Sequence, residues 1–136
     1  MKFKQPQMED QYDKLPEKMK DVCNLFSTLS EDHLITPVVT RVCDPVPGES
    51  GVHEQHRAVD FRNQYFDGKN NVWLYNQETI EEIVSEINKT FPRNDGKLVC
   101  IHHSFNQMPF HFHLQIMASW VTREEYEKLN SNENDL

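Results

Sequence analysis

Long apolar segments and an excess of basic residues are both missing from this sequence. The longest uninterrupted apolar runs are only four residues, as in Leu98-Val99-Cys100-Ile101, whereas a helix needs about 20 apolar residues to cross a bilayer. Lys and Arg number 14 against 22 Asp and Glu, for a net charge of −8, so the basic stripes of nucleic-acid-binding proteins are not expected. We therefore expect neither membrane insertion nor a nucleic-acid partner.

Cysteine is scarce and odd in number. Cys23, Cys43 and Cys100 are widely spaced, which fits reduced thiols better than a disulfide framework. No apolar stretch follows the lysines at the start of the chain, so no signal peptide can be recognised. We expect synthesis in the cytoplasm without a signal peptide.

The length of 136 residues suits a single domain, and 37 % hydrophobic residues allow one modest core. We expect an N-terminal arm over residues 1–10 and a polar tail over 130–136. Helical periodicity predicts helices over 12–29, with Pro16 in the first turn, and over 79–91. A capping box at Thr122–Glu125 predicts the start of a last helix.

Short β-branched or alternating segments predict strands. The predicted strands are 36–42, 58–61, 97–105 and 110–116, the last two forming an antiparallel hairpin. Residues 62–78 are expected to form a surface excursion with a turn at Asp67-Gly68. Its aromatic residues either line a groove or, as we favour, pin the excursion to the sheet; they are Tyr65, Phe66, Trp73 and Tyr75. The predicted class is α+β, a small antiparallel sheet with helices packed on it.

Histidine, in contrast, is abundant. Six of the seven histidines lie in two short stretches. Strand alternation places His111 and His113 together on the face opposite Phe112. Since His102 and His103 are adjacent, they face opposite ways. We expect His103 to be a solvent-exposed or supporting residue, or an ordinary edge histidine, rather than a ligand.

An aspartate and a further histidine precede this pair in the chain. Asp60 is in a predicted strand, seven residues after His53. A histidine, an aspartate and a histidine from neighbouring strands provide two nitrogens and one oxygen, the ligand set of a catalytic zinc with one open position. Each residue alone is more often an ordinary polar side chain, but their joint occurrence favours a metal site.

Two segments resemble known motifs. The segment Ser50-Gly-Val-His-Glu-Gln-His-Arg-Ala-Val-Asp-Phe61 resembles the Ser-x-His-x-x-Gly-x-Ala-x-Asp motif of the D-alanyl-D-alanine carboxypeptidase and phage endolysin metallopeptidases, and Phe110–Gln115 resembles their closing His-x-His strand. That family shares its fold with lysostaphin-type peptidases and the hedgehog signalling domain. The resemblance covers about residues 15–117, and it implies a hedgehog/DD-peptidase-like fold.

Carried over residue by residue, the resemblance implies that His53, Asp60 and His113 bind Zn²⁺. It implies that His111 assists proton transfer beside the metal, and that Arg41 receives a substrate carboxylate. The implied chemistry is zinc-assisted hydrolysis of a peptide bond.

Two positions depart from the family pattern. His56 stands where the family has glycine, and we expect it to be a solvent-facing replacement. Phe110 stands three residues before His113, where many members carry an acidic general base. The lysostaphin-like branch relies instead on the histidine before the final ligand, which is His111 here. Glu54 and His103 are further candidate bases.

The resemblance implies a zinc metallopeptidase, a hydrolase of peptidoglycan stem peptides of DD- or LD-carboxypeptidase or endopeptidase type, as in a phage lysis enzyme. Such an enzyme would act on the cell wall after release, or as part of a virion. The alternative is a non-catalytic virion or binding protein that retains the zinc-peptidase fold. A third and weaker reading, a cupin-like barrel or another metal hydrolase, is disfavoured by the two strong helical patterns.

Overall fold

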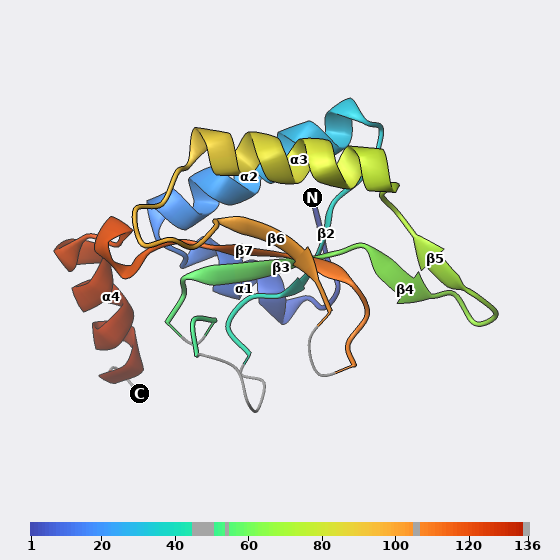
Figure 1. Ribbon diagram of the computed structural model, residues 1–136. Coiled ribbons are helices and arrows are strands. Elements are labelled where there is room, and N and C mark those ends of the chain that lie inside the picture. Colours follow the sequence, from blue (N-terminus) through green and yellow to red (C-terminus); the bar gives the residue numbers. More distant parts are fainter. Residues whose placement is uncertain (45–50, 54, 105–106, 135–136) are drawn as a thin grey trace.

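The computed structural model describes residues 1–44, 51–53, 55–104 and 107–134 (Figure 1). Its helices are α1 (Gln7–Asp13), α2 (Glu17–Asp32), α3 (Gln77–Thr90) and α4 (Arg123–Asn134), with a 3-10 turn η1 (Ala118–Trp120). Its strands are β1 (Lys2–Phe3), β2 (Val38–Arg41), β3 (Ala58–Arg62), β4 (Gln64–Phe66), β5 (Asn71–Trp73), β6 (Cys100–His103) and β7 (His111–Gln115). The predicted α+β class is confirmed.

Five of the strands form one sheet in the order β1-β2-β3-β7-β6. The predicted antiparallel hairpin of β6 and β7 is confirmed, and β2, β3 and β7 also pair antiparallel. The sheet is nevertheless mixed, because Lys2 and Phe3 pair parallel with Val38 and Val39. This edge strand lies inside the predicted N-terminal arm. Parallel neighbours need a long crossover connection, and α1 with α2 provides it.

The predicted helix over residues 12–29 is in fact two helices. Pro16 has an extended backbone, with ψ of 149°, and precedes the first residue of α2. Proline restricts the residue before it to extended conformations, so the chain leaves the helical path here instead of continuing through the first turn. The predicted helix over residues 79–91 is confirmed as α3, which spans Gln77–Thr90. At its start the Asn76 side chain accepts a hydrogen bond from Thr79 N (2.8 Å).

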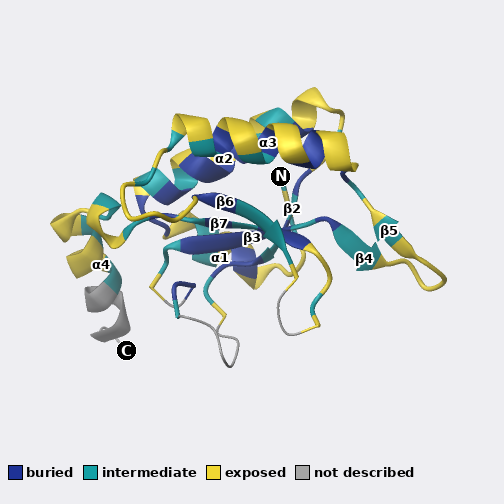
Figure 2. Ribbon diagram, viewed as in Figure 1, coloured by how far each residue is buried: buried dark blue, intermediate teal, exposed yellow. Residues whose placement is uncertain are grey.

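Helices α2 and α3 lie together over one face of the sheet (Figure 1). Their inward sides are buried and their outward sides exposed (Figure 2). Phe26 of α2 stacks on Phe61 of β3, with ring centroids 4.3 Å apart, and meets Phe112 of β7 at 4.9 Å. All three rings are fully buried. We call this side of the sheet the apolar face.

The predicted excursion over residues 62–78 contains the small hairpin of β4 and β5. Its turn is the predicted one, since the Asp67 carboxylate accepts hydrogen bonds from the backbone of residues 69 and 70. Tyr75 and Trp73 pin the excursion: the Tyr75 hydroxyl donates to Ser30 Oγ (2.8 Å) in the core, and Trp73 packs against His102. Phe66, in contrast, is exposed.

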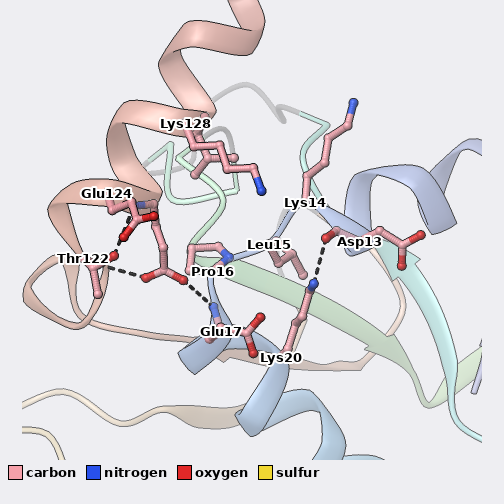
Figure 3. A pocket seen from close by; sticks show the side chains of 11 residues that line it. Asp13, Lys14, Leu15, Pro16, Glu17, Lys20, Thr122, Glu124 and Lys128 are labelled. Atoms are coloured by element: carbon pink, nitrogen blue, oxygen red, sulfur yellow. Dashed lines mark hydrogen bonds between the residues drawn. The ribbon is translucent and has the colours of Figure 1, made fainter.

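A carboxylate that is hydrogen-bonded to Thr122 and to Glu17 attaches the last helix to the start of α2 (Figure 3). Glu125 and Thr122 form the predicted capping box, with hydrogen bonds of 2.9 and 3.1 Å. The second oxygen of Glu125 accepts from the backbone N–H of Glu17 at 2.7 Å. The same side chain therefore caps the amino termini of both α4 and α2.

Candidate metal centre

The face of the sheet opposite α2 and α3 carries polar side chains. Since Phe61 and Phe112 face the helices, alternation turns their neighbours to the other side. Asp60 pairs directly with His113, and Arg62 with His111, across β3 and β7. His103 of β6 pairs with His111 from the other side. We call this side the histidine face.

His53 reaches this face from the segment between β2 and β3, and it is 1 % exposed. Its Nδ1 lies 2.9 Å from the carbonyl oxygen of Val42. Because a carbonyl only accepts, Nδ1 carries the hydrogen and a neutral ring keeps its lone pair on Nε2. This Nε2 is buried without a hydrogen bond among the described residues and lies 3.4 Å from Asp60 Oδ1.

His113 is held in a similar way. Its Nε2 lies 3.0 Å from Gln115 Oε1, and its Nδ1 lies 2.9 Å from the same Asp60 oxygen. With Nε2 donating to the amide oxygen, the Nδ1 of a neutral ring presents a lone pair to the carboxylate. Sequence reasoning missed Gln115 as the orienting residue, although its place two residues after His113 puts it on the same face.

Asp60 is buried between these rings. Burial opposes ionisation of its carboxyl group, but hydrogen bonds from His113 and His53 and their positive charges, which both require protons on the nitrogens that face Asp60, outweigh burial and hold its pKa below the ordinary value. A carboxylate facing two imidazole lone pairs is repulsive unless protons or a cation neutralise it. The arrangement of Asp60, His53 and His113 therefore suits a cation.

The distances in this group fit a metal ion. The candidate ligand atoms of His53, Asp60 and His113 all lie within 4.8 Å of one another. Ligands about 2.0–2.2 Å from a tetrahedral ion are roughly 3.3 Å apart, close to the 3.4 Å between His53 and Asp60. Histidine ligands typically donate their second nitrogen to a carbonyl or carboxylate, as both rings do here. The group can hold a metal ion.

Arg41 reaches the same site through an irregularity in β2. Val39 pairs with Phe61 but Arg41 pairs with Asp60, so the register shifts by one residue between them. A bulge of this kind re-aims the following side chain, which turns Arg41 from the apolar face to the histidine face. Its guanidinium is buried, and Nη1 lies 3.8 Å from Asp60 Oδ2.

His111 stands beside the group and not within it. Its Nδ1 donates to the carbonyl oxygen of Pro109 at 2.9 Å. The remaining nitrogen, Nε2, lies 3.6 Å from Asp60 Oδ2. His111 can therefore accept a proton at Nε2, on the side of Asp60 away from His53 and His113.

The other candidate residues have separate places. His103 is half-buried on the histidine face, outside the group of His53, Asp60 and His113. Its ring lies 4.7 Å from that of His111 and 5.5 Å from that of His113, so it is not simply exposed. His56, expected to face solvent, is half-buried with Nδ1 3.1 Å from Cys43 Sγ. Its φ of +59° is the left-handed conformation that favours glycine, the residue at this position in the motif it resembles. Ser50 and Glu54 lie outside the described residues.

A cleft of about 500 Å³ opens beside Asp60 and His111. It is lined by Lys4, Thr40, Arg41, Asp60, Arg62, Gln64, Tyr65, Phe66, Met108, Pro109, Phe110 and His111. A second hollow, of about 470 Å³, lies between α4 and the start of α2 (Figure 3). The second hollow contains no histidine, and its Glu125 is occupied as a helix cap. The first cleft is the one that adjoins the candidate metal centre.

Comparison of the chain with protein families, with curated proteins and with solved structures found no match. Within the described part of the chain, none of the helices combines the length and apolar character needed to cross a membrane. The geometry of the histidine face and the motifs that the sequence resembles are therefore the basis for the proposed function.

Proposed function

We propose that this protein is a zinc-dependent peptidase that hydrolyses a bond in peptidoglycan stem peptides, with a hedgehog/DD-peptidase-like fold. One observation supports the proposal most strongly. His53 Nε2 and His113 Nδ1 point at one oxygen of Asp60, while their other nitrogens are held by carbonyl oxygens. Two imidazoles and one carboxylate are the ligand set of catalytic zinc with an open position.

Each residue of the site would have a separate role in hydrolysis of the peptide bond. A zinc ion held by His53, Asp60 and His113 would polarise the peptide carbonyl and lower the pKa of a water molecule. His111 would take the proton at Nε2, because its Nδ1 is already engaged with Pro109. Arg41 would bind a substrate carboxylate, since a guanidinium fork matches that group. Arg41, Asp60 and His111 all line the cleft.

A non-catalytic protein with a structural metal is the alternative, and one observation favours it. Asp60 is the only carboxylate among the residues that line the cleft in the described part of the chain. Met108 and Phe110 line it instead, and neither can transfer a proton. The alternative predicts stoichiometric metal without turnover.

Metal analysis and hydrolysis assays decide between these functions. Zinc-loaded protein should contain one zinc per chain and cleave peptidoglycan or a peptide containing D-amino acids. His113→Ala should lose both the metal and the cleavage. His33→Ala is the matched control, because His33 faces Glu82 at the end of α2, outside the site. Bound zinc without cleavage of either substrate would favour the alternative, and absence of bound metal would refute the zinc peptidase.

A further inference from the structure

The cleft beside the metal centre has the opposite charge balance to the whole chain. The chain carries 14 basic against 22 acidic residues, yet the cleft is lined by Lys4, Arg41 and Arg62 against one carboxylate, Asp60. That carboxylate already faces the two ligand histidines. Because Asp60 also faces Arg41, the cations of the cleft that have no carboxylate partner among the described residues are Lys4 and Arg62.

Arg62 is the most informative of these cations. It is half-buried, directly opposite His111 in the sheet, and on the same face as Asp60. Its guanidinium carbon lies 5.4 Å from the centre of the Tyr65 ring, a cation–π contact that orients the group without neutralising it. Among the described residues no acidic side chain pairs with Arg62. A partly desolvated cation of this kind favours an anion from outside.

The walls around Arg62 are fixed in place. Gln64 N donates to the Phe110 carbonyl oxygen at 2.8 Å, and Phe110 N donates to Gln64 Oε1 at 3.1 Å. Lys4 is held at the cleft by its backbone N–H, which donates to Val39 O at 2.8 Å. Arg62 is thus presented by a paired strand, and Lys4 directly follows one, which reduces the ordering cost of binding.

We propose that Arg62, assisted by Lys4, forms a second anion subsite that selects peptides carrying an internal carboxylate in addition to the group bound at Arg41. This proposal rests on the proposed function. Arg62 is two residues beyond Asp60 in β3, an advance of about 7 Å along the strand. An extended peptide advances by the same amount per two residues, so the second carboxylate would lie about two residues from the cleaved bond. Arg62 is then a specificity-determining residue and not a catalytic one.

A pair of stem-type peptides that differ only in one internal carboxylate, free in the first and amidated in the second, tests the proposal. Binding to the zinc-loaded full chain is measured by calorimetry, together with kcat/KM where cleavage occurs. The wild type should prefer the free carboxylate roughly tenfold, the effect of one charge-assisted hydrogen bond. Arg62→Gln should lose this preference while keeping its affinity for the amidated peptide. Arg123→Gln is the matched control, because Arg123 is exposed on α4 and paired with Glu127. Equal binding of both peptides by the wild type, or an unchanged preference in Arg62→Gln, would overturn the proposal.

An inorganic probe separates this result from failure of the peptidase assignment. Sulfate is titrated into the metal-free protein while the Nε–H signals of the arginines are followed by NMR. The Arg62 signal should shift and saturate, and the Arg123 signal should not. A saturating shift with no binding of either peptide would retain the anion subsite and refute the peptide substrate. An unmoved Arg62 signal would refute the subsite itself.

Discussion

The two faces of the five-stranded sheet differ in what stabilises them. On the apolar face, Phe61 and Phe112 pack against Phe26 and depend on nothing outside the chain. On the histidine face, their immediate neighbours Asp60 and His113 belong to a polar group that can hold a metal ion. Burial alone stabilises the first face, whereas the second would gain stability from a bound cation.

Truncation of the apolar face should have the largest effect on folding. Phe112→Ala removes a fully buried ring that contacts Phe26 and Tyr75. We expect a loss of about 3–5 kcal/mol in the free energy of unfolding, from lost burial and the cavity left behind. Urea denaturation in the presence of chelator measures it. Phe66→Ala is the control, because that ring is 66 % exposed and its loss should cost less than about 0.5 kcal/mol. Equal losses in the two variants would show that the apolar face does not carry the stability.

Removal of the carboxylate should abolish stabilisation by metal. With zinc at about 100 times its dissociation constant, the wild type should gain about 2.7 kcal/mol, and chelator should reverse the gain. Asp60→Asn should gain nothing, since it loses the one anionic ligand of the group. Thermal unfolding with zinc and with chelator measures both. Asp95→Asn is the control, because it removes a carboxylate paired with Arg93, and it should keep the full stabilisation by zinc. If Asp60→Asn also kept that stabilisation, this group would be excluded as the metal site.

The dependence of the unfolding free energy on pH should come in part from His102, which lies on the apolar face. Burial, followed by the positive charges of His111 and His103, lowers the pKa of His102 from 6.5 to about 4. Its Nε2 accepts a hydrogen bond from the Asn63 amide at 2.7 Å, which protonation would break. Between pH about 6.5 and about 4 the unfolded chain binds a proton at this position that the folded chain does not. Its contribution to stability is therefore complete above pH about 6.5 and is lost as the pH falls to about 4.

Unfolding of His102→Gln in chelator at several pH values between 7 and 4 checks this contribution. The glutamine keeps an acceptor for Asn63 but does not titrate. The free-energy difference between wild type and variant should shrink as the pH falls, because only the wild type loses the contribution of His102. Parallel stability curves would show that His102 takes no part in the pH response.

The smallest effect should arise at the end of α2. Leu34 follows the helix with φ of +60° and is 96 % exposed, so it contributes nothing to the apolar face. The backbone N–H of Ile35 donates to the Ser30 carbonyl oxygen at 3.0 Å, a helix ending at which glycine is favoured. Leu34→Gly should therefore raise stability by about 1 kcal/mol and leave zinc affinity unchanged. Thermal unfolding and a zinc titration measure the two, and a fall in melting temperature would contradict the assignment.

Much of the fold was predictable wherever the local pattern decides it. The alternation in β7 separates Phe112 from His113, and the same alternation in β3 separates Phe61 from Asp60. These two strands alone define both faces of the sheet. The His-x6-Asp and His-x-His spacings likewise named the residues that the structure brings together.

The remainder depends on pairings that no local pattern contains. The parallel pairing of Lys2–Phe3 with β2 joins segments about 36 residues apart, and the bulge that turns Arg41 is a property of two strands, not one. The interruption at Pro16 was missed because a proline in a first helical turn and one just before a helix look alike in sequence. The contact of His56 with Cys43 depends on the folded path of the segment, so the local sequence predicts a solvent-facing side chain instead.

The shared cap at Glu125 has a consequence for the order of folding. Pro16 gives α2 no side-chain cap, and the group that replaces it lies 108 residues later in the chain. At a synthesis rate of about 5–20 residues per second, this cap reaches the ribosome exit roughly 5–20 s after α2 begins to emerge. Contacts between such distant segments also carry the largest loop-closure entropy. The first turn of α2 should thus be among the last parts of the molecule to gain protection from hydrogen exchange during folding.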